Sequence, residues 1–218
     1  MMYYYPMMNQ YRQDMKRMMT VTGDASLSFE PDKVTIQLGV VTESEQLSQA
    51  QQENARKMNQ VIQSLLQLGI PKENIQTTAY NINPMYDYID GKQQFRGYQV
   101  SNAITVQMTN IDQAGKVIDI AVQNDVNQVS NIQFSREDNE GPYQQALSAA
   151  LKNAIVKAQT IAETLEVNVD PIPTKIVERI NDSKVAYKTF AMTENNHTTP
   201  IEPGKIKVEA TVEAQFQY

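Results

Sequence analysis

Strict alternation of apolar and polar residues marks the end of the chain, residues 205–218. Apolar side chains occupy every second position from Ile206 to Phe216, and polar ones fill the positions between. A period of two places alternate side chains on opposite faces of a β-strand, so the pattern predicts a strand with one packed and one wet face. Similar runs predict further strands over 20–29, 33–41, 75–82, 97–108, 126–135 and 174–180.

Apolar residues at spacings of three and four predict helices over 47–68, 111–123 and 143–165. Gly69 and Pro71 should end the first, because glycine takes the left-handed conformation that closes a helix and proline cannot continue one. The third helix carries many alanines on one face, which indicates close approach to a sheet or another helix.

These elements predict an α+β fold with an antiparallel-rich sheet packed by about three amphipathic helices. Pro31 and Asp32 are turn formers between the first two strands, which we therefore expect to pair as a hairpin. A single domain is expected over 20–218, with a long polar excursion at 181–203. Residues 1–19, rich in Met and Tyr, are expected to form a disordered head.

Composition narrows the chemistry. The chain has 218 residues and 19 Lys and Arg against 25 Asp and Glu, a net charge of −6, and no basic stripe, which argues against nucleic acid as a partner. Cysteine is absent, which excludes disulfides and thiol catalysis. The one histidine, His197, sits in a polar Asn- and Thr-rich loop and is expected to be solvated. No cofactor motif is present, so we expect no cofactor.

The chain start carries no pattern typical of a secretory leader, because Pro6 and the polar residues 9–16 interrupt any apolar run. The expectation is a cytoplasmic or cell-associated bacterial protein. No apolar run approaches the roughly 18 residues of a transmembrane segment, so none is predicted.

Aromatic residues gather around one predicted turn, Asp90-Gly91, a typical hairpin pair. Tyrosine is enriched at protein interfaces because it joins a rigid apolar ring to a polar tip. The cluster is a candidate oligomer contact or ligand-binding patch, and ordinary sheet packing is the alternative. Its members are Tyr80, Tyr86, Tyr88, Phe95 and Tyr98.

Two acidic loops, around 87–90 and 137–140, offer the oxygen ligands that hard cations prefer. The simpler interpretation is a solvated hairpin tip for Asp87 and Asp90, and a favourable helix start for Glu137, Asp138 and Glu140. A small-ligand-binding or metal-assisted enzyme would require these acids to converge on one cleft.

Several short motifs, taken in order and spacing, resemble the SIMPL-domain family from residue 20 to residue 218. They are Val21-x-Gly23, Pro31-Asp32, Leu38-Gly39-Val40, Asn54-Ala55, Leu68-Gly69-Ile70, Asn74-Ile75-Gln76-Thr77, Pro84-x-Tyr86, Gly97-Tyr98-x-Val100-x-Asn102, Ile132-x-Phe134 and the Ala-rich third helix. The resemblance implies an α+β domain, often periplasmic or secreted, that in some members forms ring-like or channel-like homo-oligomers. Members are linked to oxidative-stress protection and, in animals, to signalling adaptors, without established enzymatic activity or catalytic residues.

We therefore predict a non-enzymatic self-assembling or binding protein, a homo-oligomer joined through sheet edges and the Tyr-rich hairpin. A link to stress protection is a further hypothesis, in which the chain's 11 methionines are oxidised sacrificially. Most of the methionines that this hypothesis uses lie in residues 1–19.

Overall fold

The computed structural model describes residues 17–179 and 199–218. The chain divides into two compact units. One holds residues 28–139 with 199–207 and is called here the four-stranded unit, and the other holds residues 17–27, 140–179 and 208–218 and is called the three-stranded unit. Each name refers to the sheet that the unit contains.

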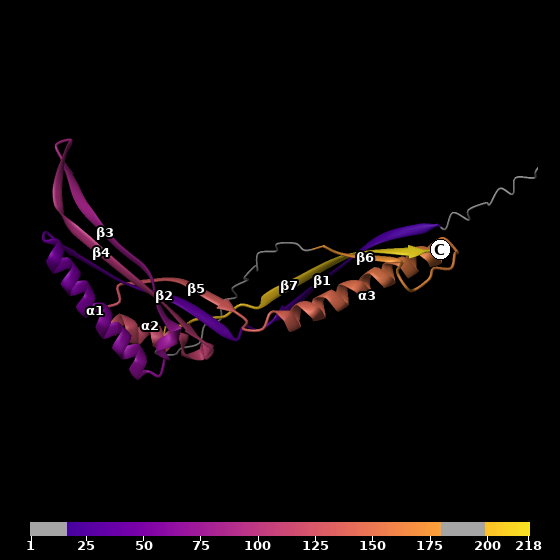
Figure 1. Cartoon of the computed structure of the whole chain (residues 1–218), viewed down its shortest axis with the longest axis horizontal. Helices are drawn as coiled ribbons and strands as arrows, with labels where there is room; N and C mark the ends of the chain where they lie inside the picture. The colour runs from indigo at the N-terminus through magenta and orange to yellow at the C-terminus, as the bar shows by residue number, and fades with distance from the viewer. Residues whose placement is uncertain (1–16, 180–198) are drawn as a thin grey trace, which may run out of the picture. The chain divides into compact units, whose positions relative to one another are not determined.

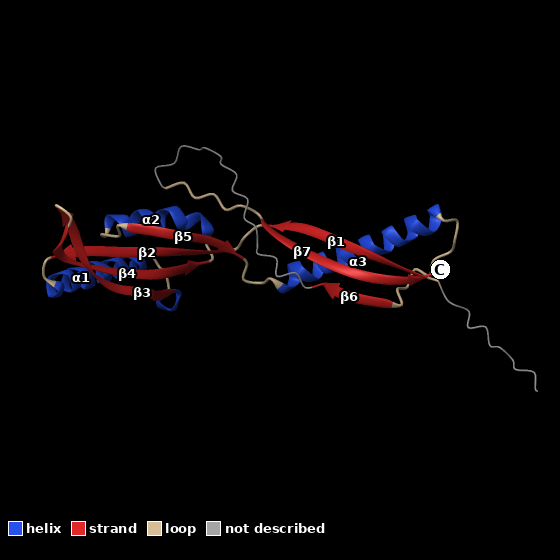
Figure 2. Cartoon of the chain, turned by 90° about the horizontal axis from the view of Figure 1, so that it is seen from above, coloured by secondary structure: helices blue, strands red, loops and turns tan. Residues whose placement is uncertain are grey.

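The four-stranded unit is an antiparallel sheet in the order β3-β4-β2-β5, covered by helices on one face (Figures 1 and 2). Its helix α1 packs on the central strands β2 and β4, and α2 contacts α1 and β2. Single 3₁₀ turns at Lys72–Asn74 and Ile111–Gln113 precede β3 and α2. The elements are β2 (Lys33–Ser44), α1 (Leu47–Gln67), β3 (Ile75–Ile89), β4 (Lys92–Met108), α2 (Ala114–Gln123) and β5 (Gln128–Ser135).

The core of this unit follows from the two periodicities. The apolar face of β2, which includes Val34 and Leu38, is fully buried against the helices, together with Val61 and Leu65 of α1. Gly69 has a φ of 93° and its N–H bonds the Leu66 carbonyl, so it closes α1 as the sequence predicts.

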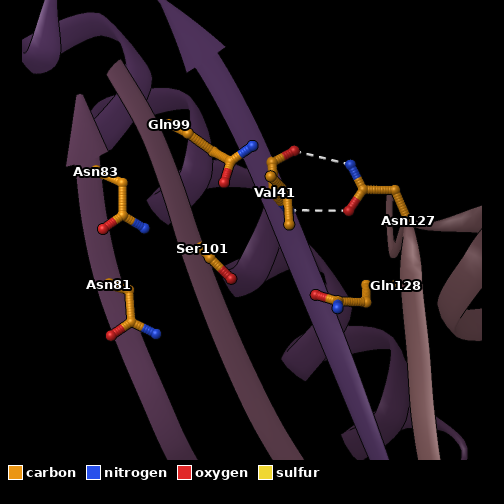
Figure 3. A pocket seen from close by; sticks show the side chains of 7 residues that line it. All are labelled: Val41, Asn81, Asn83, Gln99, Ser101, Asn127 and Gln128. Atoms are coloured by element: carbon orange, nitrogen blue, oxygen red, sulfur yellow. Dashed lines mark hydrogen bonds between the residues drawn. The ribbon is translucent and has the colours of Figure 1, made fainter. Parts of the chain in front are cut away.

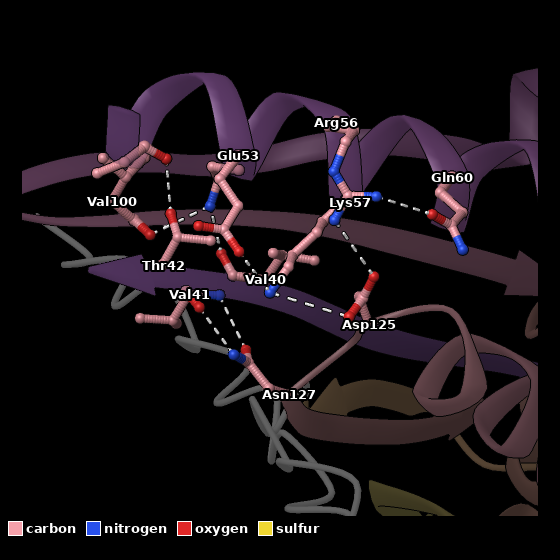
Figure 4. A network of polar contacts seen from close by, with 12 residues as sticks. Val40, Val41, Thr42, Glu53, Arg56, Lys57, Gln60, Val100, Asp125 and Asn127 are labelled. Atoms are coloured by element: carbon pink, nitrogen blue, oxygen red, sulfur yellow. Dashed lines mark hydrogen bonds and ion pairs between the residues drawn. The ribbon is translucent and has the colours of Figure 1, made fainter. Parts of the chain in front are cut away.

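Polar side chains fix α1 and the start of β5 to the sheet (Figure 4). Asn54, fully buried in mid-helix, donates from Nδ2 to the carbonyls of Val40 (2.8 Å) and Val100 (3.1 Å) on adjacent strands. The side-chain amide of Asn127 bonds both the N–H and the C=O of Val41 on β2. It therefore extends the contacts of β5 with β2 from Gly39, the last paired residue, to Val41.

The three-stranded unit pairs strands in the order β1-β7-β6 beneath one long helix, α3. Its helix buries a stripe of alanines spaced four apart, from Ala146 to Ala162, against the sheet. Tyr143 of α3 donates to the Glu178 carboxylate of β6 at 2.5 Å, which raises the pKa of Tyr143. The elements are β1 (Met18–Phe29), α3 (Glu140–Thr164), β6 (Lys175–Arg179) and β7 (Ile206–Gln217).

The α+β class and its three helices are confirmed. The expected hairpin between the first two strands is wrong, because β1 pairs with β7 whereas β2 lies between β4 and β5. β1 begins at Met18, inside the expected head, and residues 1–16 lie outside the described part of the chain. So do His197 and most of the 181–203 excursion. A single domain over 20–218 stays a prediction.

Within residues 17–179 and 199–218, none of the helices is long and apolar enough to cross a membrane.

Candidate functional site

The β3–β4 ribbon runs past the other strands of its sheet (Figure 1). Residues 80–98 are called here the arm, which comprises the two-stranded part of the ribbon together with Tyr98 and residues 80–84 of β3 that lead into it. The last residue of β2 to pair with β4 is Ser44, opposite Tyr98, so the ribbon beyond that pair is two-stranded. At its tip Asp90 and Gly91 both have positive φ, 51° and 74°, between the paired Ile89 and Lys92. Two such residues make the type I′ turn that suits a two-residue hairpin loop, as predicted.

One face of the arm is aromatic. Tyr86 lies directly opposite Phe95, with ring centroids 5.8 Å apart, and Phe95 lies 5.1 Å from Tyr98, both pairs edge to face. Such geometry stabilises aromatic pairs because the positive ring edge meets the negative ring face. The rings nevertheless stay open to solvent, with exposed fractions of 45% for Tyr86, 51% for Phe95 and 75% for Tyr88.

The other face of the arm holds an ion-paired cluster. The pairing of β3 with β4 shifts between Met85 and Tyr86, which leaves Arg96 as an extra residue in a β-bulge. Its guanidinium lies 2.7 Å from Glu43 Oε2 and 3.9 Å from Asp87 Oδ1. Bulges redirect side chains, and this one separates the charged groups from the aromatic face.

All five residues of the predicted site lie on the face of the arm that carries the aromatic rings. Tyr80, Tyr86 and Tyr88 alternate along β3, and Phe95 and Tyr98 stand beside them on β4. Ile82, an exposed residue of the same alternating series, is not part of the predicted aromatic cluster because its side chain is aliphatic. These six residues are called here the aromatic face, and their role as a contact stays a prediction.

The two acidic loops do not converge. Asp87 lies beside Glu43 near one end of β2, whereas the Glu137 N–H donates to Asp32 Oδ1 (2.8 Å) next to the other end. The two ends of this 12-residue strand are eleven residue steps apart, a distance of about 36 Å. No group of three or more His, Asp or Glu positioned to hold a metal ion occurs among the described residues. The metal-assisted alternative therefore lacks the cleft that it requires.

A second feature is a polar hollow of about 580 Å³ on the sheet face that no helix covers in the four-stranded unit (Figure 3). Side chains from all four strands or their ends contribute to it, and none of the lining residues is charged. The hydrophobic pattern of the sequence does not predict this hollow. The lining residues are Val41, Asn81, Asn83, Gln99, Ser101, Asn127 and Gln128, and we call the site the amide hollow.

Two of its amides are already engaged. Asn127 binds the Val41 backbone, and Gln99 Nε2 donates to Glu43 Oε1 at 2.9 Å. Within the described chain, the side chains of Asn81, Asn83, Ser101 and Gln128 have no hydrogen-bond partner inside the hollow (Figure 3). The absence of a side chain at Gly39 makes room for Gln128, because a Cβ added at Gly39 would lie only 3.2 Å from the Cβ of Gln128.

Comparison with known sequences supplies the family. A family-wide sequence model described as "SIMPL: Protein of unknown function (DUF541)" matches residues 19–216. The chain belongs to the SIMPL family. The resemblance seen in the motifs is thereby confirmed, and the match includes parts of both units of this SIMPL chain.

Two kinds of curated relative resemble the SIMPL chain. The 26 kDa periplasmic immunogenic protein of Brucella melitensis is 26% identical over 213 residues, which cover 90% of this chain and 83% of that protein. The uncharacterized protein YggE of Escherichia coli K12 is 25% identical over 151 residues, 69% of this chain and 61% of YggE. Neither name states an activity.

Proposed function

We propose that this SIMPL protein is a non-enzymatic binding protein that self-associates through the aromatic face of its arm. The observation that carries the proposal is an apolar face, lined by interacting rings, in which every residue except the half-buried Tyr98 is at least 37% exposed in the described structure. An isolated two-stranded ribbon is at best marginally stable in water, so a covering partner would stabilise the distal arm. Burying its rings would supply the driving force.

A second copy of the chain suits this face chemically. The six residues of the aromatic face are uncharged, so two copies meet without like-charge repulsion. Aromatic rings also pack well against other rings, which makes the face self-complementary, as a two-fold interface requires. The outer edge of β3 is unpaired in the described sheet, and it offers backbone groups to the same partner.

Native mass tests the proposal directly. Light scattering at tens of micromolar should show an oligomer for the full chain and a monomer for the double variant Tyr86→Ser with Phe95→Ser, because the substitutions remove the central rings. The matched control is Val156→Ser with Leu165→Ser, which removes two similarly exposed apolar side chains from α3 or its end. A strictly monomeric full chain, or a control that dissociates the oligomer equally, would contradict the proposal.

The names of the relatives support a proposal about where in the cell this protein is found. The Brucella proteins are named as periplasmic, and this favours a periplasmic location for the chain over the cytoplasmic one expected from its sequence. Stress protection stays a hypothesis, and most of the methionines that it invokes lie outside the described residues.

A further inference from the structure

The amide hollow suggests a ligand that the aromatic face does not. We propose that the uncovered face of the four-stranded sheet binds a short neutral oligosaccharide, held by the amides of Asn81, Asn83 and Gln128 and the hydroxyl of Ser101. This site is independent of the proposed self-association, because its side chains come from the face opposite the rings.

The absence of charge among the described lining residues indicates which class of ligand the hollow can bind. No lining residue is ionised, and the neighbouring carboxylate of Glu43 is already paired with Arg96 and Gln99. The hollow thus offers no cation to a phosphate or a carboxylate and no anion to a metal ion. A ligand that fits such a surface is itself neutral.

Hydrogen-bonding capacity narrows the class further. Each free Asn or Gln amide presents two N–H donors and a carbonyl acceptor, and Ser101 adds a hydroxyl that both donates and accepts. Sugar hydroxyls also donate and accept, and they occur at close intervals along an oligosaccharide. Among the described residues that line the hollow, Val41 alone is apolar, which leaves too little apolar surface for the core of a protein interface.

Size and rigidity agree with a ligand of a few sugar rings. The hollow spans four adjacent strands, three spacings of about 4.8 Å each, or about 14 Å. Its volume lies in the range of about 300–1,000 Å³ that small-ligand sites occupy. Asn127, held by two bonds of 2.7 and 2.8 Å to Val41, gives it a fixed wall.

The test is a titration of the full chain with maltotriose, cellotriose and chitotriose, followed by the side-chain amide resonances in ¹H–¹⁵N NMR spectra. We expect the amides of Asn81, Asn83 and Gln128 to shift in a saturable way with at least one sugar below about 10 mM. The variant Asn81→Ala with Ser101→Ala removes one directly paired amide and hydroxyl, and it should weaken binding about tenfold.

The matched control is Gln133→Ala with Thr35→Ala, another directly paired amide and hydroxyl outside the hollow, which should leave the affinity unchanged. The arm variant Tyr86→Ser with Phe95→Ser should also bind sugar normally, which separates this site from self-association. No shift with any of the three sugars, or equal weakening by the control, would overturn the inference. Shifts that follow protein concentration without sugar would assign the hollow to a second copy instead and overturn it as well.

Discussion

Asn54 shows how one polar residue can hold a helix on a sheet. Its Nδ2 lies over two strands and donates to both Val40 and Val100, while its Oδ1 is buried without a partner among the described residues. Leaving a buried polar atom unpaired costs about 1–3 kcal/mol, so this position carries a penalty as well as two bonds. The apolar periodicity of the sequence places Asn54 on the inner face of α1, but it does not predict these two hydrogen bonds to the sheet.

Asn54→Asp should destabilise the chain by more than about 3 kcal/mol at neutral pH, because a buried carboxylate would replace the donor that faces two carbonyl oxygens. Burial raises the pKa of the introduced acid above its unfolded value, so the loss should shrink as the pH falls and the acid becomes protonated. Denaturant unfolding at several pH values measures both effects. Asn59→Asp on the exposed side of α1 is the control, and it should change stability by less than about 0.5 kcal/mol.

An equal loss at all pH values would contradict this explanation for Asn54, since only the ionised form carries the predicted penalty.

At the scale of elements, α3 and β1 approach so closely that a side chain does not fit between them. A Cβ added at Gly23 would overlap the Ala150 carbonyl oxygen and lie 2.6 Å from the Ala154 nitrogen. Both are backbone atoms of α3, which cannot rotate away as a side chain would. The alanine stripe and Gly23 therefore form one interface, in which neither partner tolerates added volume.

Gly23→Ala should destabilise the three-stranded unit by about 3 kcal/mol, because the helix must move off the sheet to admit the methyl group. Thr20→Ala, on the exposed face of the same strand, is the control and should be near neutral. Unfolding in urea measures the difference. A change as small for Gly23→Ala as for the control would show that α3 adjusts without cost.

The sequence predicts local elements better than their partners. Alternation places both ends of β2 and β7 to within three residues and the end of β4 at Met108, since each pattern depends on burial along one strand. The partner of β1 could not be predicted in this way. β1 pairs with β7, which lies almost at the other end of the chain, and nothing in residues 20–29 encodes that pairing. Pro31 and Asp32 do mark the break between two strands, but the described residues form no turn there, and the chain leaves one sheet and enters another.

The candidate sites also combine features that the local sequence predicts with features that depend on how the strands pair. The Asp90-Gly91 pair predicts the turn at the tip of the arm, but the strands were expected to end at 82 and to begin at 97, whereas β3 runs to Ile89 and β4 begins at Lys92. The bulge at Arg96, which separates rings from charges, depends on cross-strand register. The amide hollow was missed because polar alternating positions are normally read as a wet face. The sequence feature that could have indicated this hollow is the type of polar residue. Its side chains bear amides and a hydroxyl instead of charges, at Asn81, Asn83, Ser101 and Gln128.

At the scale of the whole molecule, the two units differ in how the chain builds them. The three-stranded unit needs both ends of the chain, because β1 and β6 flank β7. The four-stranded unit draws its whole sheet and both helices from residues 28–139, with a core that joins β2, β4, α1 and α2. Of the described residues beyond 139, the segment 199–207 also belongs to this unit, and Thr199 donates to Asp119 of α2.

A fragment of residues 28–139 should therefore fold on its own, with dispersed amide resonances and cooperative urea unfolding, since its buried core is local in sequence. It keeps the arm, so it should also self-associate as the full chain does and become monomeric with Tyr86→Ser and Phe95→Ser. A chain truncated before residue 205 is the comparison: it loses β7, and hydrogen exchange should show protection in β2–β5 with none in β1 or α3. A disordered 28–139 fragment would instead support one cooperative domain over 20–218, because the four-stranded unit would then need the rest of the chain to fold.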